Sequence, residues 1–422
     1  MSHSPRSRLD TAAVQRRTVW TLAAAQVFSG LSAGSTLTLG SILAVQFAGA
    51  EVWAGASNTA VTLGTACTAV PLSRMALRTG RRVALASGLC GAIVGTVLLV
   101  YAVIIQSFPV LVLGSFCVGV ANAVNLQARF AVTDLARPER RGRDLSFVVW
   151  AITIGAVFGP NLVAPGAVVA VALGLPSSAG AFLISAAGMI VGCAIIWWGL
   201  RPDPLLVRAE LDADGKPVSG SADASSAGGW AVCRRYPAAA AVMVVMAGAH
   251  AAMVAVMTMT PVHLNHESAT GTAEAGTIGL IGLTISLHIA GMFALSPIMG
   301  WLTDRVGAWR TALGGLTTLL VATGGAAAFN HQTLLVISCL VLLGVGWSAA
   351  TVAGSTLLAE TLPAQHRVAA QGFSDSVMSF AAAAAALSGG PVMAVAGFPG
   401  VAVVAAAVSL LAAVIAARFA AR

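Results

Sequence analysis

The sequence predicts an all-α membrane protein with twelve transmembrane helices in two pseudo-symmetric six-helix halves. Three observations lead to this fold class. First, 58% of the 422 residues are hydrophobic and only 9% are charged, whereas a soluble domain carries roughly 25% charged residues. Second, the apolar residues form runs that are long enough to cross a bilayer. Third, the two halves of the chain share landmarks at a nearly constant offset.

The apolar runs define the individual spans, because a bilayer core about 30 Å thick requires about 20 apolar residues per helix. Division at glycine, proline and charged residues gives spans at 19–48, 52–73, 83–106, 108–134, 145–172, 178–200, 236–263, 277–302, 311–329, 332–360, 369–396 and 398–418. The most polar stretch has the composition of a flexible linker and separates six spans from six. The predicted domains are therefore a cytoplasmic tail at 1–18, an N-terminal half at 19–200, the linker at 201–235 and a C-terminal half at 236–422.

Charged residues indicate which side of the membrane each loop faces. Lys and Arg occur almost only in alternate loops, and the intervening loops carry Glu51, Glu267 and Glu274 instead. Cytoplasmic loops carry such an excess of positive charge, so both termini of this multi-pass protein are predicted to lie on the cytoplasmic side of the cell membrane. The net charge of +8 is thus explained by topology, and we expect no nucleic-acid partner.

Landmarks of the first half recur in the second half. The matched pairs are Gly80 with Gly307, Asp134 with Glu360, and Pro160 with Pro391. Their offsets of 227, 226 and 231 residues agree to within five. Two halves related by an axis along the membrane normal are typical of secondary transporters that bind substrate near the bilayer midplane.

The segment GWLTDRVGAWR at 300–310 resembles the cytoplasmic loop motif of the major facilitator superfamily. The resemblance extends over the whole chain through the span count, the repeat and the linker. It implies a secondary transporter that works by alternating access. It also implies that Gly300 allows close helix approach, that Asp304 approaches the N-terminus of a facing helix, and that Arg305 or Arg310 pairs with Glu360.

These contacts would form a cytoplasmic gate that holds the halves together in the outward-open state. The gate residues implied by the resemblance are Gly300, Asp304, Arg305, Arg310 and Glu360, with Arg78 and Asp134 in the first half. The first-half copy of the motif, SRMALRTGRR, is degraded, since Leu77 stands where the motif has Asp and Ser73 where it has Gly. We therefore expect an asymmetric gate.

A second motif, GAVFGP at 155–160, resembles the fifth-span motif of drug–proton exporters. Its Gly-Pro step bends a helix, and Gly155 and Gly159 permit tight packing. This copy continues as NLVAPG and lacks the closing glycine pair. The motif favours antiport, and a packing kink explains it equally well.

Methionine and histidine gather on one face of spans seven and eight. Five residues from Met243 to Met257 fall within a sector of about 80°, and His288, Met292 and Met299 fall within about 40°. Thioether and imidazole groups suit Cu(I). The Met-xxx-Met spacing in span seven and the His-xxx-Met spacing in span eight resemble the CcoA-like copper importers of the same superfamily. The predicted substrate track comprises Met246, His250, Met253, Met257, His288 and Met292.

Alternatives remain open for these residues. The methionine face is also typical of a flexible apolar surface that packs or binds hydrophobic compounds. In the outer loop, His263 and His266 would capture metal or would simply be solvated. His250 and Asp375 are candidates for proton coupling, although Asp375 could instead be a helix N-terminal charge near the cytoplasmic interface. Arg129 in span four would pair with an acid or contact substrate.

The sequence thus predicts a secondary active transporter, with copper(I) uptake as the first substrate hypothesis. The alternative is proton-coupled efflux of a hydrophobic drug-like compound or metabolite. A GxxxxGK[ST] phosphate loop is absent from the sequence, so ATP is not expected to drive transport directly. We expect no enzymatic activity, no cofactor (copper would be substrate), and a monomer whose partner is the lipid bilayer.

Overall fold

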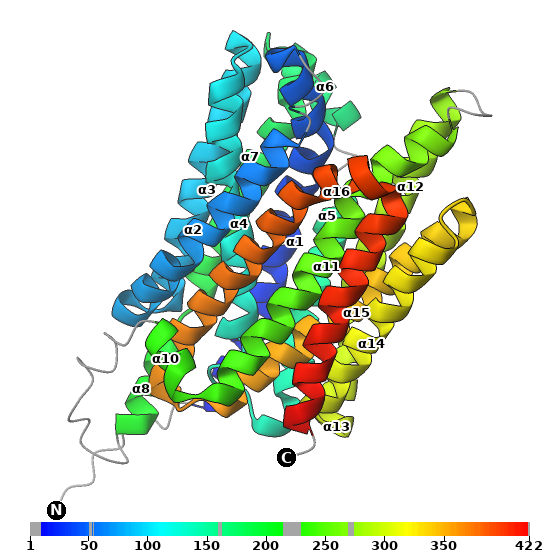
Figure 1. Cartoon of the computed structure of the whole chain (residues 1–422). Helices are drawn as coiled ribbons and strands as arrows, with labels where there is room; N and C mark the ends of the chain where they lie inside the picture. Colours follow the sequence, from blue (N-terminus) through cyan, green and yellow to red (C-terminus); the bar gives the residue numbers. More distant parts are fainter. Residues whose placement is uncertain are drawn as a thin grey trace, which may run out of the picture.

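The computed structural model describes residues 10–49, 53, 55–158, 163–213, 229–268 and 274–420, and this described part contains helices and no strand. Long helices run roughly alongside one another in a single bundle (Figure 1). Nine of the described helices are long and apolar enough to cross a membrane. The all-α membrane fold predicted from the sequence is confirmed.

The N-terminal half supplies the first group of long helices. They are α1 (Thr11–Ala48), α2 (Ala56–Thr79), α3 (Arg81–Ile105), α4 (Phe108–Ala131), α5 (Arg141–Phe158), α6 (Val163–Ala172) and α7 (Gly180–Gly199), with short 3-10 turns at Pro138–Arg140 and Ser177–Ala179. The predicted fifth span corresponds to α5 followed by α6. Gly159 and Pro160 of the GAVFGP motif lie outside the described residues.

The C-terminal half contains the remaining long helices. They are α11 (Pro237–Ser268), α12 (Glu274–Phe293), α13 (Ser296–Val306), α14 (Ala308–Ala328), α15 (Thr333–Thr361) and α16 (Ala364–Ala420). The predicted eighth span is divided between α12 and α13, and Pro297 occupies the first turn of α13, where its missing N–H leaves no helical bond unmade. The predicted spans eleven and twelve both lie within α16. A kink at Gly397, where φ is 64°, separates them.

The stretch predicted as a flexible linker, 201–235, contains two short helices at its ends. These are α8 (Pro204–Ala213) and α10 (Gly229–Arg235). Residues 214–228 lie outside the described part. The side chain of Asp203 caps the start of α8, where its Oδ1 accepts the backbone N–H of Leu205 at 3.0 Å. Its Oδ2 accepts the backbone N–H of Arg82 at 2.8 Å, so α8 is attached to the start of α3.

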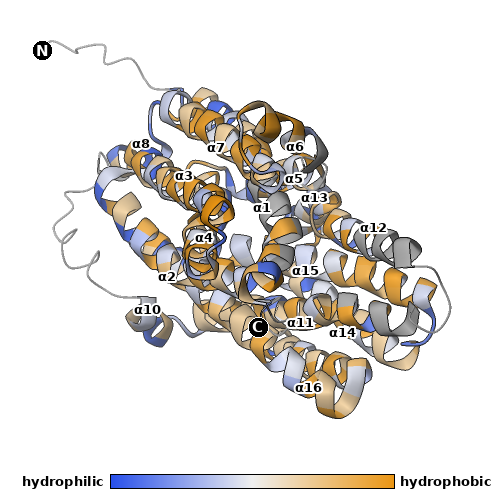
Figure 2. Ribbon diagram, turned by 90° about the horizontal axis from the view of Figure 1, so that it is seen from above, coloured by the Kyte–Doolittle hydropathy of each residue, from blue (hydrophilic) through white to orange (hydrophobic). Residues whose placement is uncertain are grey.

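Each half has its own apolar core, and the outer surface is apolar as well. Leu22, Leu89 and Leu145 belong to the N-terminal core, while Leu316 and Leu340 belong to the C-terminal core. Figure 2 shows apolar residues over the outward faces of α3, α7 and α16. Such a surface is stable against lipid tails and not against water. The helices α8, α10 and α13 lie at the same end of the molecule as the C-terminus (Figure 1).

Candidate functional site

A central cavity of about 260 Å³ lies between the two halves. The N-terminal half contributes lining residues from α1, α2, α4 and α5, and the C-terminal half contributes them from α11, α12, α15 and α16. Amide and hydroxyl groups come mainly from the N-terminal half; they include Gln26, Asn58, Thr62, Asn122 and Asn125. Aromatic rings and thioethers come from the C-terminal half; they include Met253, Met257, Met292, Phe293 and Trp347. The two walls of the cavity therefore differ in chemistry.

Arg129 joins this cavity to a carboxylate of the opposite half. Its Nη2 donates a hydrogen bond to Oδ1 of Asp375 on α16, and the two side chains are 2% and 0% exposed. Gln127 of α4 donates to the other carboxylate oxygen of Asp375 at 3.3 Å. The alternative of a helix N-terminal charge for Asp375 is wrong, because α16 begins at Ala364 and the carboxylate is buried between the halves.

A buried polar network continues from the Arg129–Asp375 pair toward the end of the bundle at which the C-terminus lies. Nε of Arg81 donates to Oδ2 of Asp134 at 2.9 Å, and Nη1 donates to Oε1 of Gln127 at 3.1 Å. Nη2 donates to Oε1 of Gln371 on α16 at 2.9 Å. Burial raises the pKa of the Asp134 carboxyl above its ordinary value, and the neighbouring Arg81 guanidinium opposes that rise. The network thus contacts both halves through hydrogen bonds on one guanidinium.

The predicted gate included Arg78, but this side chain is exposed on the surface of α2. Arg81, three residues further, supplies the partner of Asp134 instead. The reason is a break in the helix at Gly80, where φ is 90°. α3 begins directly after it, so Arg81 is the residue that points inward between α3 and α4.

Asp304 lies against the first turn of α5. Its two carboxylate oxygens accept the backbone N–H groups of Gly142 at 2.8 Å and Arg143 at 2.9 Å. The start of a helix carries unpaired N–H groups and a partial positive charge, which favour an anion there. Gly300, one turn earlier on α13, lies so close to α5 that an added Cβ would stand 2.5 Å from the Gly142 carbonyl oxygen.

The predicted pairing of Glu360 with Arg305 or Arg310 is wrong. Glu360 at the end of α15 approaches Arg141 of α5, with Nη1 and Oε1 3.9 Å apart. Arg305 lies over the ring of Trp301 at 5.3 Å, and Arg310 is exposed. Both arginines are on the outer side of the α13–α14 corner, whereas Glu360 faces α5.

The predicted methionine and histidine track is only partly in the central cavity. His250, Met253, Met257 and Met292 line it. The side chain of His250 is fixed there, because Nε1 of Trp347 donates to its Nδ1 at 2.7 Å. The imidazole therefore carries its proton on Nε2 when neutral.

Met246 and His288 are not among the lining residues. Met246 packs against Gly354 and Ser374. His288 is fully buried, and its Nδ1 is 2.7 Å from the carbonyl oxygen of Leu340 on α15. At this position α12 and α15 are so close that an added Cβ on Gly344 would stand 2.5 Å from the His288 carbonyl oxygen. This contact directs His288 toward α15, so the prediction that it shares one track with Met253 is not matched by the geometry.

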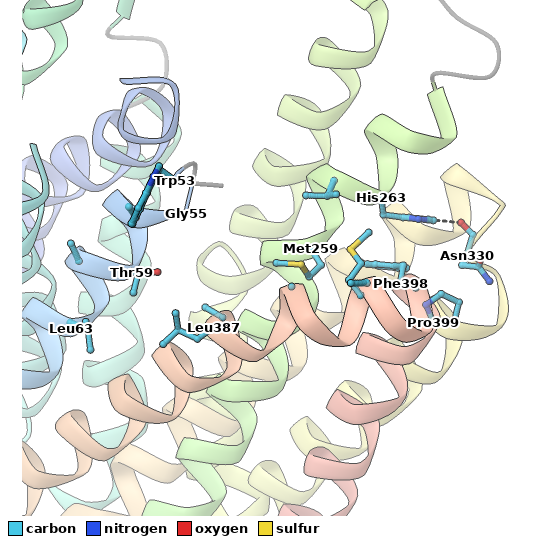
Figure 3. A pocket seen from close by; sticks show the side chains of 18 of the residues that line it. Trp53, Gly55, Thr59, Leu63, Met259, His263, Asn330, Leu387, Phe398 and Pro399 are labelled. Carbon is cyan, nitrogen blue, oxygen red and sulfur yellow. Dashed lines mark hydrogen bonds between the residues drawn. The ribbon is translucent and has the colours of Figure 1, made fainter. Parts of the chain in front are cut away.

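A second, larger cavity, the vestibule, lies at the end opposite the C-terminus and has a volume of about 1040 Å³. Figure 3 shows Trp53 and Leu63 on one side of it and Met259, His263 and Phe398 on the other. His263 stacks on Phe398 with ring centroids 4.2 Å apart. Its Nε2 is 2.7 Å from the carbonyl oxygen of Asn330. The side chain of His266 lies outside the described residues.

The functional pairs missed by sequence reasoning involve glutamine. Gln127 connects Arg81 to Asp375 of the Arg129–Asp375 pair, and Gln371 accepts a hydrogen bond from Arg81 across the two halves. Both lie within predicted spans, and a polar side chain inside a membrane helix needs a partner. That signal was present in the sequence, although it did not specify which partners would meet.

These features define a multi-pass membrane transporter built from two helical halves around a shared cavity. The chain belongs to the Major Facilitator Superfamily, whose family model matches residues 22–281 and 268–422. It is similar to the MFS-type transporter YdeG of Bacillus subtilis (strain 168), with 33% identity over 377 residues that cover 89% of this chain and 85% of YdeG.

Two further comparisons agree with this assignment. The chain is similar to the riboflavin transporter RfnT of Brucella anthropi, with 24% identity over 391 residues that cover 90% of each protein. The crystal structure of the human organic anion transporter MFSD10 has the same fold, with a TM-score of 0.74 and 16% identity over 95% of this chain and 99% of that one.

Proposed function

We propose that the chain moves a small organic compound across the cell membrane by alternating access and couples this movement to a proton through Asp375. The observation that carries the proposal is the buried Arg129–Asp375 pair. It joins the two halves, and its arginine lines the central cavity. A charge buried away from water is stable only when it is paired. Protonation of Asp375 would neutralise the carboxylate and weaken the bond between the halves.

The composition of the cavity supports an organic substrate. Amide and hydroxyl groups face aromatic rings and thioethers across a space of about 260 Å³, which suits a compound with both hydrogen-bonding groups and an apolar body. The relative RfnT is named as a riboflavin transporter, and a substrate of that general kind is compatible with such a lining. The proposal covers both a drug-like compound and a metabolite.

In this proposal both termini lie in the cytoplasm, as the distribution of Lys and Arg predicts. The vestibule then opens to the outside, and the contacts of Asp304, Arg81 and Arg129 close the cytoplasmic side. This arrangement would be the outward-open state of a monomeric transporter.

The test uses purified protein reconstituted into liposomes. We would impose a pH gradient, offer a metabolite mixture and identify the retained compounds by mass spectrometry. Wild-type protein and Arg418→Gln, which changes an exposed arginine near the C-terminus, should accumulate a compound with the gradient. Asp375→Asn should lose this accumulation and retain exchange of the compound without a gradient. Equal gradient-driven accumulation by Asp375→Asn would contradict the coupling role.

Copper(I) uptake is the second candidate, because three thioethers and the His250 ring line the same cavity, and soft ligands suit Cu(I). The positions of His288 and Met246 outside the lining weaken this candidate. Within the described ranges, no group of three or more His, Cys, Asp or Glu side chains is arranged to hold a metal ion.

Accumulation of radioactive copper in cells tests whether copper(I) is a substrate. Cells that express the chain are compared with cells that express Met253→Leu/Met292→Leu at matched levels. Uptake that depends on these thioethers would support copper as substrate, whereas accumulation equal to that of empty cells would exclude it.

A further inference from the structure

Three polar groups of the central cavity have no hydrogen-bond partner although they are buried. They are Nδ2 of Asn125, Nε of Arg129 and Oγ1 of Thr351. Folded proteins leave few buried polar atoms unpaired, because each one loses its hydrogen bonds to water without replacement. Three such atoms around one cavity indicate that a ligand completes their hydrogen bonds.

The chemistry of these groups specifies an acceptor. Oδ1 of Asn125 already accepts the hydroxyl of Ser29 at 2.6 Å, so the amide presents its NH₂ group. Arg129 gives Nη2 to Asp375 and keeps its Nε–H unpaired. Asn125 and Arg129 are four residues apart on α4 and therefore share one helix face. An arginine and an amide NH₂ on one face together favour a carboxylate or a similar anionic oxygen group.

The charges around the cavity also favour an anionic ligand. Among the described lining residues, Arg129 carries the only permanent positive charge, and none is Asp or Glu. Asp375 forms an ion pair with Arg129, but Asp375 does not itself line the cavity. A bound anion would therefore meet one guanidinium and no acidic side chain within the cavity wall.

The opposite wall of the cavity carries aromatic rings and thioethers. Phe293 and Trp347 meet edge to face with ring centroids 5.7 Å apart, and Met253 and Met292 lie beside them in the lining. Aromatic and thioether groups of this kind pack well against a planar ring.

We propose that the central cavity binds a small organic anion, with its carboxylate on Arg129 and Asn125 and an apolar or aromatic body against Trp347 and Phe293. This inference rests on the proposed transport of organic compounds and names the class of substrate. It also makes Asp375 a competitor, because the side-chain carboxylate and the substrate carboxylate bind the same guanidinium.

The experiment measures thermal unfolding of the purified full-length protein in detergent, where a ligand that binds only the folded state raises the melting temperature. The probes are two matched pairs, indole-3-acetate with indole-3-acetamide and benzoate with benzamide, at millimolar concentration. At least one carboxylate should stabilise the wild type, and its uncharged amide should have a much smaller effect.

Three variants test the assigned residues. Asp375→Asn removes the competing carboxylate and should bind the stabilising carboxylate about tenfold more tightly than wild type. Arg129→Gln/Asp375→Asn removes both charges together, which avoids leaving one buried charge unpaired, and should lose the difference between carboxylate and amide. Arg418→Gln, on the exposed end of α16, should behave as wild type.

Two results would overturn the assignment. One is equal stabilisation by the amide and the carboxylate, and the other is the absence of stabilisation by every carboxylate of the set. Either result would leave proton-coupled transport of an uncharged compound standing. Conversely, carboxylate binding without any gradient-driven accumulation in liposomes would sustain the anion site and contradict the proposed coupling.

Discussion

At the scale of single residues, the Arg81–Asp134 pair illustrates how much depends on one buried guanidinium. Arg81 is fully buried and contacts a carboxylate and two glutamine side chains. Removal of one partner of a buried ion pair leaves the other charge without compensation, at a cost of about 3–5 kcal/mol. Replacement of both partners by neutral groups avoids most of that cost.

We therefore predict that Arg81→Gln strongly lowers the thermal stability of the protein, and that Arg81→Gln/Asp134→Asn recovers part of the loss. Arg78→Gln is the matched control, because Arg78 is exposed on the neighbouring helix. Melting temperatures of the wild type, Arg81→Gln, Asp134→Asn and the double variant form a double-mutant cycle. Equal destabilisation by the single and double variants would show that Arg81 acts through packing and not through charge.

A second residue-scale prediction concerns Gly300. An alanine there would place its Cβ 2.5 Å from the Gly142 carbonyl oxygen, which belongs to backbone and cannot rotate away. Gly300→Ala should destabilise the contact between α13 and α5 by about 1–3 kcal/mol. Gly314→Ala is the control, because nothing lies within 4 Å of the position of its Cβ. A melting temperature of Gly300→Ala equal to that of Gly314→Ala would refute the close approach.

At the scale of helices, periodicity predicted the composition of faces but not what each face contacts. On α12, His288 and Met292 share a narrow sector. The close crossing of α15 nevertheless encloses His288, while Met292 reaches the cavity. The boundary between the predicted spans eleven and twelve was also not evident from periodicity, since within α16 only the backbone conformation of Gly397 separates them.

That conformation leads to a prediction at the element scale. Gly397 has φ 64°, in the left-handed region, which costs a residue with a Cβ roughly 1–2 kcal/mol. Gly397→Ala should lower the melting temperature by a corresponding amount. Gly390→Ala, within the same helix and without a close neighbour, should have little effect. If the two variants had the same melting temperature, the turn between the two spans would not depend on glycine.

At the scale of the whole molecule, the two ends of the bundle differ. Polar contacts join the halves toward the C-terminal end, and the vestibule separates them at the other end. If both termini are cytoplasmic, the vestibule is accessible from outside the cell. The 62% exposed side chain of Leu387 lies in its lining.

Thiol labelling tests this orientation. In a variant without native cysteines, Leu387→Cys should react with a membrane-impermeant maleimide in intact cells. Arg418→Cys should react only after the membrane is permeabilised. The reverse pattern would invert the predicted topology.

The sequence by itself determined the class of fold, because hydropathy and loop charge are local properties that each span expresses alone. It also indicated Asp304, Arg129, Asp375 and the methionine face as residues of interest. The tertiary structure alone decided which partners meet. Arg129 and Asp375 are 246 residues apart, Arg81 replaced Arg78, and Arg141 replaced Arg305 as the arginine nearest Glu360. Such choices depend on how each helix is rotated and where it crosses its neighbours, and these depend on contacts with distant parts of the chain.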